Sequence, residues 1–198
     1  MVLDIVKFGH PALRRPGAVV QSLTPEISQL IADMLETMHE ARGVGLAAQQ
    51  VGRVLQVTVL DVREATERPS TLELDGKPAD VASFMPLVLI NPEVTSLGKP
   101  VLGPEGCLSF PEIFADISRP ESIEVKALDQ NWKRLHFRCG GLLARAIQHE
   151  LDHLRGILFI DRMDSERKRE LGPELDELQA ETKAALQTRA KRRETARR

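Results

Sequence analysis

The sequence is poor in cysteine and has no long apolar run. Only two cysteines, Cys107 and Cys139, occur in 198 residues, too few for the disulfide framework of small secreted proteins. No stretch approaches the roughly 18 consecutive apolar residues of a transmembrane helix, and residues 1–7 lack the apolar segment of a signal peptide. We therefore expect no membrane span and a cytoplasmic protein, in which each cysteine is a core residue, a nucleophile or a metal ligand.

Acidic and basic residues are unevenly distributed along the chain. The formal net charge is −2, but residues 180–198 hold seven basic and two acidic side chains, so this segment carries +5 and the rest of the chain −7. An acidic body with a basic tail predicts that a polyanionic partner binds the tail.

The hydrophobic periodicity predicts an α+β fold. Helices are expected at 24–42, at 141–155 and, from residue 164 on, in a stretch interrupted by Gly172-Pro173. Strands are expected at 54–61, at 87–90, where Asn91-Pro92 ends the run, and in a hairpin of 123–128 with 134–138. Helix 141–155 is apolar on most sides, which predicts burial with its charged cluster facing a cavity. A narrow apolar stripe that could dock the C-terminal stretch on the body consists of Leu171, Leu175, Leu178, Thr182 and Ala185.

Residues 62–86 form a long segment between two predicted strands. Its 25 residues are rich in proline, glutamate, aspartate and serine, and loops of this length are uncommon in compact domains. Two interpretations stay open: a surface insertion, or a flap beside an active site.

The sequence HELDH at residues 149–153 predicts a metal site. Positions i and i+4 of a helix lie on one face, so His149 and His153 can bind one metal ion. Glu150 then lies beside the ion and can take a proton from metal-activated water. Burying two histidines and two carboxylates would be costly without a metal ion or other partners.

A third protein ligand is needed if one coordination position is to stay open for water. Glu170 and Glu174 follow downstream but flank the helix-breaking pair Gly172-Pro173. Cys107 lies among glycines and prolines typical of a tight turn, and its thiolate suits Fe²⁺ or Zn²⁺. From this segment alone, a buried core cysteine stays an alternative.

Residues 43–50 (GVGLAAQQ) superficially fit a dinucleotide-binding fingerprint of the Gly-x-Gly-x-x-Ala type. That fingerprint follows a strand and opens a helix. Here a predicted helix precedes the motif and a strand follows it, so we exclude nucleotide binding.

The three segments GVGLAAQQ (43–50), EGCLS (105–109) and QHELDH (148–153) together resemble the signature motifs of the peptide deformylases, in order and in approximate spacing. The resemblance extends from about residue 7 to residue 161. It implies a catalytic domain over 1–163 and a helical, basic C-terminal tail over 164–198. The expected fold is α+β, with small antiparallel sheets packed around a buried metal-binding helix and with a C-terminal helix.

The resemblance also implies an activity and a ligand set. The enzyme would remove the formyl group from the N-terminal formyl-methionine of new polypeptides, releasing formate, by attack of metal-activated water. The family's metal ligands fall on Cys107, His149 and His153, and its general base falls on Glu150.

The remaining family roles fall on the other motif residues. The oxyanion donors fall on the side-chain amide of Gln50 and the backbone N–H of Leu108. Where some members carry an arginine that helps to hold substrate, this chain has Phe114. The residues expected next to the substrate are Val44, Gly45 and Leu46.

One divalent metal ion per chain is expected, with Fe²⁺ as the ion in the cell and Zn²⁺, Ni²⁺ or Co²⁺ equally compatible with a Cys-His-His set. The expected partners are N-formyl-methionyl nascent peptides and, through the basic tail, the ribosome. Two other functions stay open. One is a zinc endopeptidase with Glu170 or Glu174 as third ligand, and the other is a metal-stabilised binding module in which protein fills every coordination position.

Overall fold

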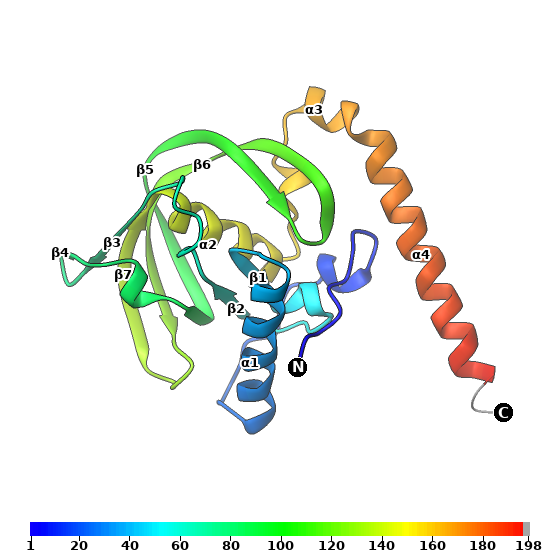
Figure 1. The fold of residues 1–198 in the computed structure, drawn as a ribbon, viewed down its shortest axis with the longest axis horizontal. Coiled ribbons are helices and arrows are strands. Elements are labelled where there is room, and N and C mark those ends of the chain that lie inside the picture. The colour runs from blue at the N-terminus through cyan, green and yellow to red at the C-terminus, as the bar shows by residue number, and fades with distance from the viewer. Residues whose placement is uncertain (196–198) are drawn as a thin grey trace.

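The computed structural model describes residues 1–195, with side chains to residue 192, and is organised around one antiparallel sheet (Figure 1). Its seven strands follow the order β1-β2-β5-β6-β7-β3-β4, and every neighbouring pair is antiparallel. The strands are β1 Gly45–Ala47, β2 Val57–Leu60, β3 Ser70–Leu74, β4 Lys77–Pro78, β5 Leu87–Cys107, β6 Phe110–Leu128 and β7 Arg134–Gly140. The helices are α1 Pro25–Glu40, α2 Gly141–Leu154, α3 Ser165–Glu170 and α4 Gly172–Thr195.

The predicted mixture of antiparallel strands and helices with a C-terminal helix is confirmed, but the described strands form one sheet and not several small ones. The predicted end of a strand at Asn91 is wrong. β5 continues to Cys107 because a register shift between Ile90 and Glu93 carries the chain past Asn91-Pro92. Such an irregularity accommodates a proline, which has no N–H for the ladder.

β5 and β6 form a long curved hairpin that arches over one end of the molecule (Figure 1). Its tight turn lies between Cys107 and Phe110, which pair with each other. The predicted turn around Cys107 is therefore present, and it places the cysteine at the end of a strand whose backbone is held by β6.

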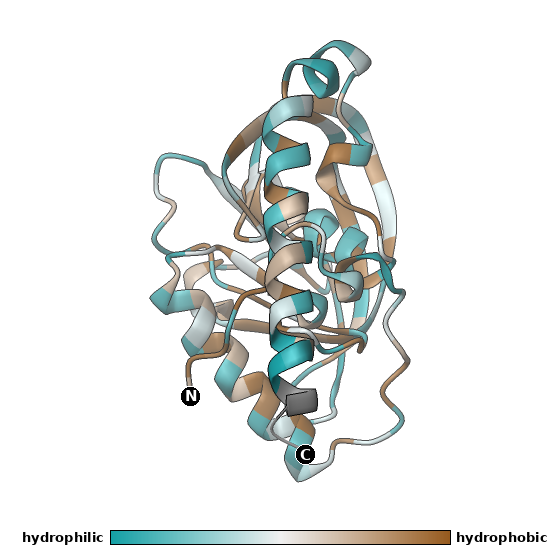
Figure 2. Cartoon of the chain, turned by 90° about the vertical axis from the view of Figure 1, so that its right-hand side faces the viewer, coloured by the Kyte–Doolittle hydropathy of each residue, from teal (hydrophilic) through white to brown (hydrophobic). Residues whose placement is uncertain are grey.

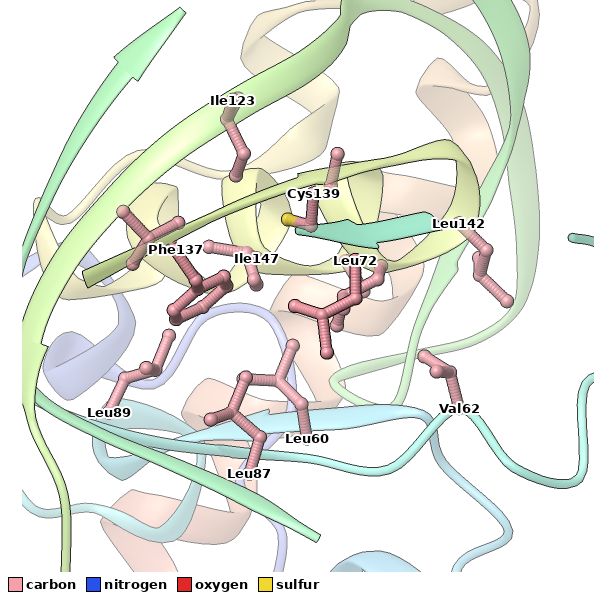
Figure 3. Close-up of a cluster of buried hydrophobic side chains, with 14 of the residues drawn as sticks. Leu60, Val62, Leu72, Leu87, Leu89, Ile123, Phe137, Cys139, Leu142 and Ile147 are labelled. Carbon is pink, nitrogen blue, oxygen red and sulfur yellow. The ribbon is translucent and has the colours of Figure 1, made fainter. Parts of the chain in front are cut away.

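Helix α2 lies against this sheet and contacts β1, β2, β3, β6 and β7. All of its residues except Gly141 and Arg145 are buried, as the sequence predicts. Figure 3 shows part of the core that it helps to form, where Ile147 of α2 lies close to Phe137 and Leu72. A helix in such surroundings cannot shift without disturbing the core, so the side chains that it carries are firmly positioned.

The segment 62–86 is more than a surface insertion. It contributes β3, which pairs with β7, and β4, which pairs with β3 at the edge of the sheet. Leu72 and Met85 of this segment belong to the main core. The segment is therefore tied to the body at both ends and in its middle.

Helix α4 runs along the outside of the molecule, and most of its residues are hydrophilic (Figures 1 and 2). Leu171 and Leu175 are buried and Leu178 is half-buried, so the predicted stripe docks at its beginning. Thr182 is half-buried and Ala185 is exposed, so the stripe is not continuous to its end, although Arg189 further along α4 still pairs with Asp4 at 3.6 Å. Arg197 and Arg198 of the predicted basic tail lie outside the described residues. No helix in the part of the chain that the structure describes has the length and apolarity to cross a membrane.

Candidate metal centre and active site

Two elements bring a thiol and two imidazoles together. Cys107 ends β5, and His149 and His153 lie one turn apart on α2. Their ligand atoms all lie within 4.8 Å of one another, and Cys107 Sγ is 3.2 Å from His153 Nε2. Both histidines are buried and the cysteine is half-buried. The i, i+4 spacing on a helix thus places both rings beside the end of the hairpin.

His149 is oriented by a carboxylate on its outer nitrogen. Its Nδ1 lies 3.0 Å from Oε2 of the buried Glu105. Burial alone would raise the pKa of Glu105, but hydrogen bonds from Arg119 and His149 outweigh it and hold that pKa well below its usual range. An ionised Glu105 accepts a hydrogen bond from Nδ1–H, which leaves Nε2 of His149 free to bind a metal ion.

Glu150 follows His149 and has an unpaired carboxylate oxygen. Oε2 of Glu150 is buried without a hydrogen-bond partner among the described residues. Burial raises the pKa of Glu150 to about 7, against the lowering effect of His149. A Cβ atom on Gly45 would overlap Oε1 of Glu150, so only glycine allows the β1 backbone to lie this close to the carboxylate.

The donor set and this orphaned oxygen fit a bound metal ion. One sulfur and two imidazole nitrogens are ligands that Zn²⁺ and Fe²⁺ accept. A buried polar atom with no partner is costly, and the oxygen of Glu150 gains a partner if water is held beside it. The three residues Cys107, His149 and His153 are those expected as ligands from the sequence.

Gln50 and Leu108 lie beside the cysteine. Nε2 of Gln50 is 3.4 Å from Cys107 Sγ and 3.4 Å from Ser109 Oγ. Oε1 of Gln50 accepts a hydrogen bond of 2.8 Å from the backbone N–H of Ala47, which fixes the orientation of the amide. Leu108 follows Cys107 in the turn, and its carbonyl accepts a hydrogen bond from Lys7 Nζ.

A cavity of about 500 Å³, large enough for the end of a peptide, opens at this site. The site residues that line it are Gln50, Cys107, Leu108, His149 and Glu150. Val44 and Gly45 line it, whereas Leu46 is fully buried in the core beneath α1 and does not. Phe114 is 60% exposed and lines the cavity. Arg68 also lines it, so the segment 62–86 contributes one residue to the wall of the cavity.

The competing third ligands are not near this cluster. Glu170 and Glu174 are both exposed, on α3 and α4, and Glu170 pairs with Arg167. Among the described residues, the group that can hold a metal ion includes neither of them.

The sequence reasoning missed an ion-pair network behind the ligands. Arg119 donates to both carboxylate oxygens of Glu105, at 2.6 and 2.9 Å, and to Asp152 at 2.8 Å. Arg145 donates to Glu105 at 2.9 Å, and Arg162 donates to both oxygens of Asp152. One feature of the sequence indicated this network. Asp152, the second carboxylate of the HELDH motif, needs a partner if its helix is buried.

Three side chains that could hold one metal ion, a neighbouring carboxylate and an open side are the features of one class of site, the hydrolytic metal centre. The comparison with known proteins narrows this class to one family. The family model described as polypeptide deformylase matches residues 2–169. The chain belongs to this family and is an enzyme, and the resemblance of its three motifs is confirmed.

Curated relatives and solved structures agree with this assignment. A peptide deformylase of Opitutus terrae is 44% identical over 187 residues, covering 93% of this chain and 97% of the relative. One of Methylacidiphilum infernorum is 43% identical, covering 90% and 93%. The crystal structure of the Legionella pneumophila enzyme has a TM-score of 0.75 at 32% identity, covering 96% of this chain and 99% of that one. That of the Synechococcus elongatus enzyme with actinonin has a TM-score of 0.71 at 38% identity, covering 91% and 85%.

Proposed function

We propose that the chain removes the formyl group from the N-terminal formyl-methionine of new polypeptides and releases formate. Family membership supports the reaction. The unpaired carboxylate of Glu150, at the end of an open cavity and next to three metal-ligand side chains, is the observation that carries the mechanism.

Cys107, His149 and His153 would hold one divalent ion. We propose Fe²⁺ in the cell, and the same ligands suit Zn²⁺, Ni²⁺ and Co²⁺. When bound, such an ion lowers the pKa of water toward neutrality and polarises a carbonyl group. Cys107 acts as a ligand in this scheme and not as a nucleophile, so no covalent intermediate forms.

Glu150 is the general base and then the general acid. Its carboxylate accepts a proton from the attacking water and returns it to the departing α-amine. A group serves both steps best when its pKa is near the working pH, and burial raises the pKa of Glu150 to about 7. Gly45 leaves the room for this carboxylate beside the substrate.

The developing oxyanion would be stabilised by two donors, the side-chain amide of Gln50 and the backbone N–H of Leu108. The amide is fixed by Ala47 with its NH₂ group toward Cys107. Removal of one well-placed donor of this kind costs roughly 3–4 kcal/mol in the transition state. Val44 and Gly45 line the cavity and would adjoin the scissile group, whereas Leu46 lies outside the cavity and has no contact to offer the substrate there.

A direct test is formate release from a formyl-methionyl peptide, with the metal content measured on the same sample. We expect release of formate that depends on the metal ion, and no cleavage inside the peptide. Internal cleavage that persists in Cys107→Ala would indicate an endopeptidase instead. Unfolding on metal removal without any turnover of the loaded protein would indicate a binding module.

The basic C-terminal tail suggests where in the cell the enzyme meets its substrate. We propose that residues 1–163 form the catalytic domain and that the basic tail within 164–198 binds ribosomal RNA, which places the enzyme in the cytoplasm beside its nascent substrates. Exposed cations gain affinity for phosphates by releasing counterions, so this binding should weaken steeply with salt. Deleting 180–198 should leave turnover of a short peptide unchanged and weaken sedimentation with ribosomes at low salt. Equal sedimentation of both forms would contradict the proposal.

A further inference from the structure

Arg68 lines the active-site cavity from the segment 62–86. Its side chain is exposed, and no hydrogen bond or ion pair joins it to another described side chain. We propose, resting on the function proposed above, that Arg68 is a specificity-determining residue, which binds an acidic side chain of the formylated peptide in one of the two residues after its methionine.

The backbone next to Arg68 is fixed to the helix that carries the metal ligands. The carbonyl of Pro69 accepts a hydrogen bond of 3.1 Å from the N–H of Leu142, and Oγ of Ser70 accepts one of 3.0 Å from the N–H of Leu143. These N–H groups belong to the first turn of α2, which lacks a side-chain cap of its own. A Cβ atom on Gly141 would overlap the Pro69 carbonyl, so glycine is required for this approach. Arg68 therefore has a defined place at the cavity.

Two other cationic side chains of the cavity, those of Arg145 and Lys7, are held by hydrogen bonds within the protein. Arg145 donates to Glu105 and to the carbonyls of Gly103, Ile117 and Val101. Lys7 donates to the carbonyl of Leu108. The charge of Arg145 is compensated by Glu105, and the ammonium of Lys7 is held at Leu108, the residue after the candidate metal ligand Cys107.

Arg42 also lines the cavity and also borders a further one, of about 680 Å³, but Asp61 and Glu64 line that further cavity and repel an acidic group. A second cavity of about 510 Å³ adjoins the first and shares Arg68, Leu142 and Arg145 with it. Arg68 thus stands where the two cavities meet, and a substrate side chain can lie there. Glu121 is the one acidic residue among those that line the second cavity, and it repels an acidic group placed beside it. The favourable position for an acidic group is therefore at Arg68.

This contact is expected to act on binding and not on the chemical step. An ion pair to a side chain beyond the reacting bond is formed equally in the ground state and in the transition state, so it lowers KM and leaves kcat unchanged. Phe114, which lines the same cavity, has no donor to offer an acidic group.

The test compares peptides that differ in one side chain, on metal-loaded enzyme at low salt. The substrates are formyl-Met-Glu-Ser, formyl-Met-Gln-Ser and formyl-Met-Lys-Ser, together with a set that carries the variable residue in third place. We expect a preference for glutamate over glutamine of about three- to fivefold in kcat/KM, carried by KM and reduced by salt, as for an exposed ion pair. Arg68→Gln should abolish this ratio and Arg68→Glu should reverse it.

Two further variants test whether the preference comes from Arg68 itself or from the general attraction of an acidic peptide to positive charge on the protein. Lys77→Gln removes the same charge from an exposed position of the same segment, outside the cavity, and should retain the preference. Arg42→Gln removes the other unengaged cation of the cavity and should retain most of it. No preference in the wild-type enzyme at either position, a ratio unchanged in Arg68→Gln, or an equal loss in Lys77→Gln would each overturn the proposal.

Discussion

Replacing Glu105 by glutamine removes one negative charge from the network behind the metal ligands. The side chain of Glu105 is 4% exposed and contacts Arg119, Arg145 and Nδ1 of His149. Glutamine has nearly the same shape but presents one NH₂ group where donors converge. At least one of these contacts is therefore lost, and the charge of Arg119 is less well compensated.

The size of the effect follows from the burial of Arg119. Breaking a buried ion pair by removing one partner costs about 3–5 kcal/mol. Arg119 keeps Asp152 at 2.8 Å, so we expect the lower end of that range, about 3 kcal/mol. For a chain of this size the melting temperature changes by roughly 2–4 °C per kcal/mol, which predicts a decrease of about 6–12 °C. Loss of the carboxylate on His149 should also weaken metal binding by about 10–100-fold.

Thermal unfolding followed by circular dichroism, with and without metal, separates the two effects. Metal-free samples report the ion-pair network alone, because a bound ligand adds its own stabilisation to the folded state. Metal affinity is measured by competition with a chelator of known affinity. The metal-free melting temperature and the metal affinity are both needed. A weaker metal affinity with an unchanged melting temperature would mean that the ion-pair network does not stabilise the fold.

The matched control is Glu124→Gln. Glu124 also accepts a hydrogen bond from an arginine, Arg138, at 3.0 Å, but its side chain is 23% exposed and that of Arg138 is 56% exposed. An exposed pair contributes at most about 1 kcal/mol, and metal binding should not change. Equal decreases for the two variants, or an unchanged metal affinity in Glu105→Gln, would refute the reasoning.

Three further results are expected. The hydrogen bond from Arg63 lowers the pKa of Asp61 to about 2. Because this folded-state pKa is depressed, Asp61→Asn should reduce the free energy of unfolding by about 2 kcal/mol at pH 7. Urea titrations should show this difference shrinking as the pH falls from about 4 to about 2, and a constant difference would contradict the prediction. Burial raises the pKa of the Cys139 thiol to about 12, so a thiol reagent at pH 8 should modify only Cys107 in the metal-free folded protein; reaction of both thiols would contradict this. The Fe²⁺ enzyme should lose activity in air and the Ni²⁺ enzyme should not, because Fe²⁺ and its thiolate can be oxidised; equal half-lives would show that oxidation at the metal is not the cause.

The elements that depend on local signals could be predicted from the sequence. Helix α1 begins after Thr24, whose Oγ accepts a hydrogen bond from the N–H of Ile27, as its capping residue and following proline predict. The hairpin of β6 and β7 was likewise visible from its turn residues. The two histidines of α2 needed only helical periodicity, since their spacing fixes a common face.

The features that depend on distant contacts could not be predicted. Asn91 does not end a strand because its side chain bonds the N–H and the carbonyl of Val20, far away in the sequence, which stabilises an irregular turn of β5. Arg119 meets Asp152 only because β6 crosses α2. Such pairings follow from the tertiary fold, and no local pattern around these residues encodes them.

The role of Glu150 is the central claim, and one measurement tests it most directly. Metal content and formate release are determined on the same samples of the wild-type protein and of Glu150→Gln, loaded with Ni²⁺ under identical conditions. We predict about one metal ion per chain in both proteins, with turnover reduced by about 10²–10⁴-fold in the variant, because the proton acceptor is lost and the ligands Cys107, His149 and His153 are kept. Loss of the metal from Glu150→Gln, or turnover close to that of the wild type, would contradict the account.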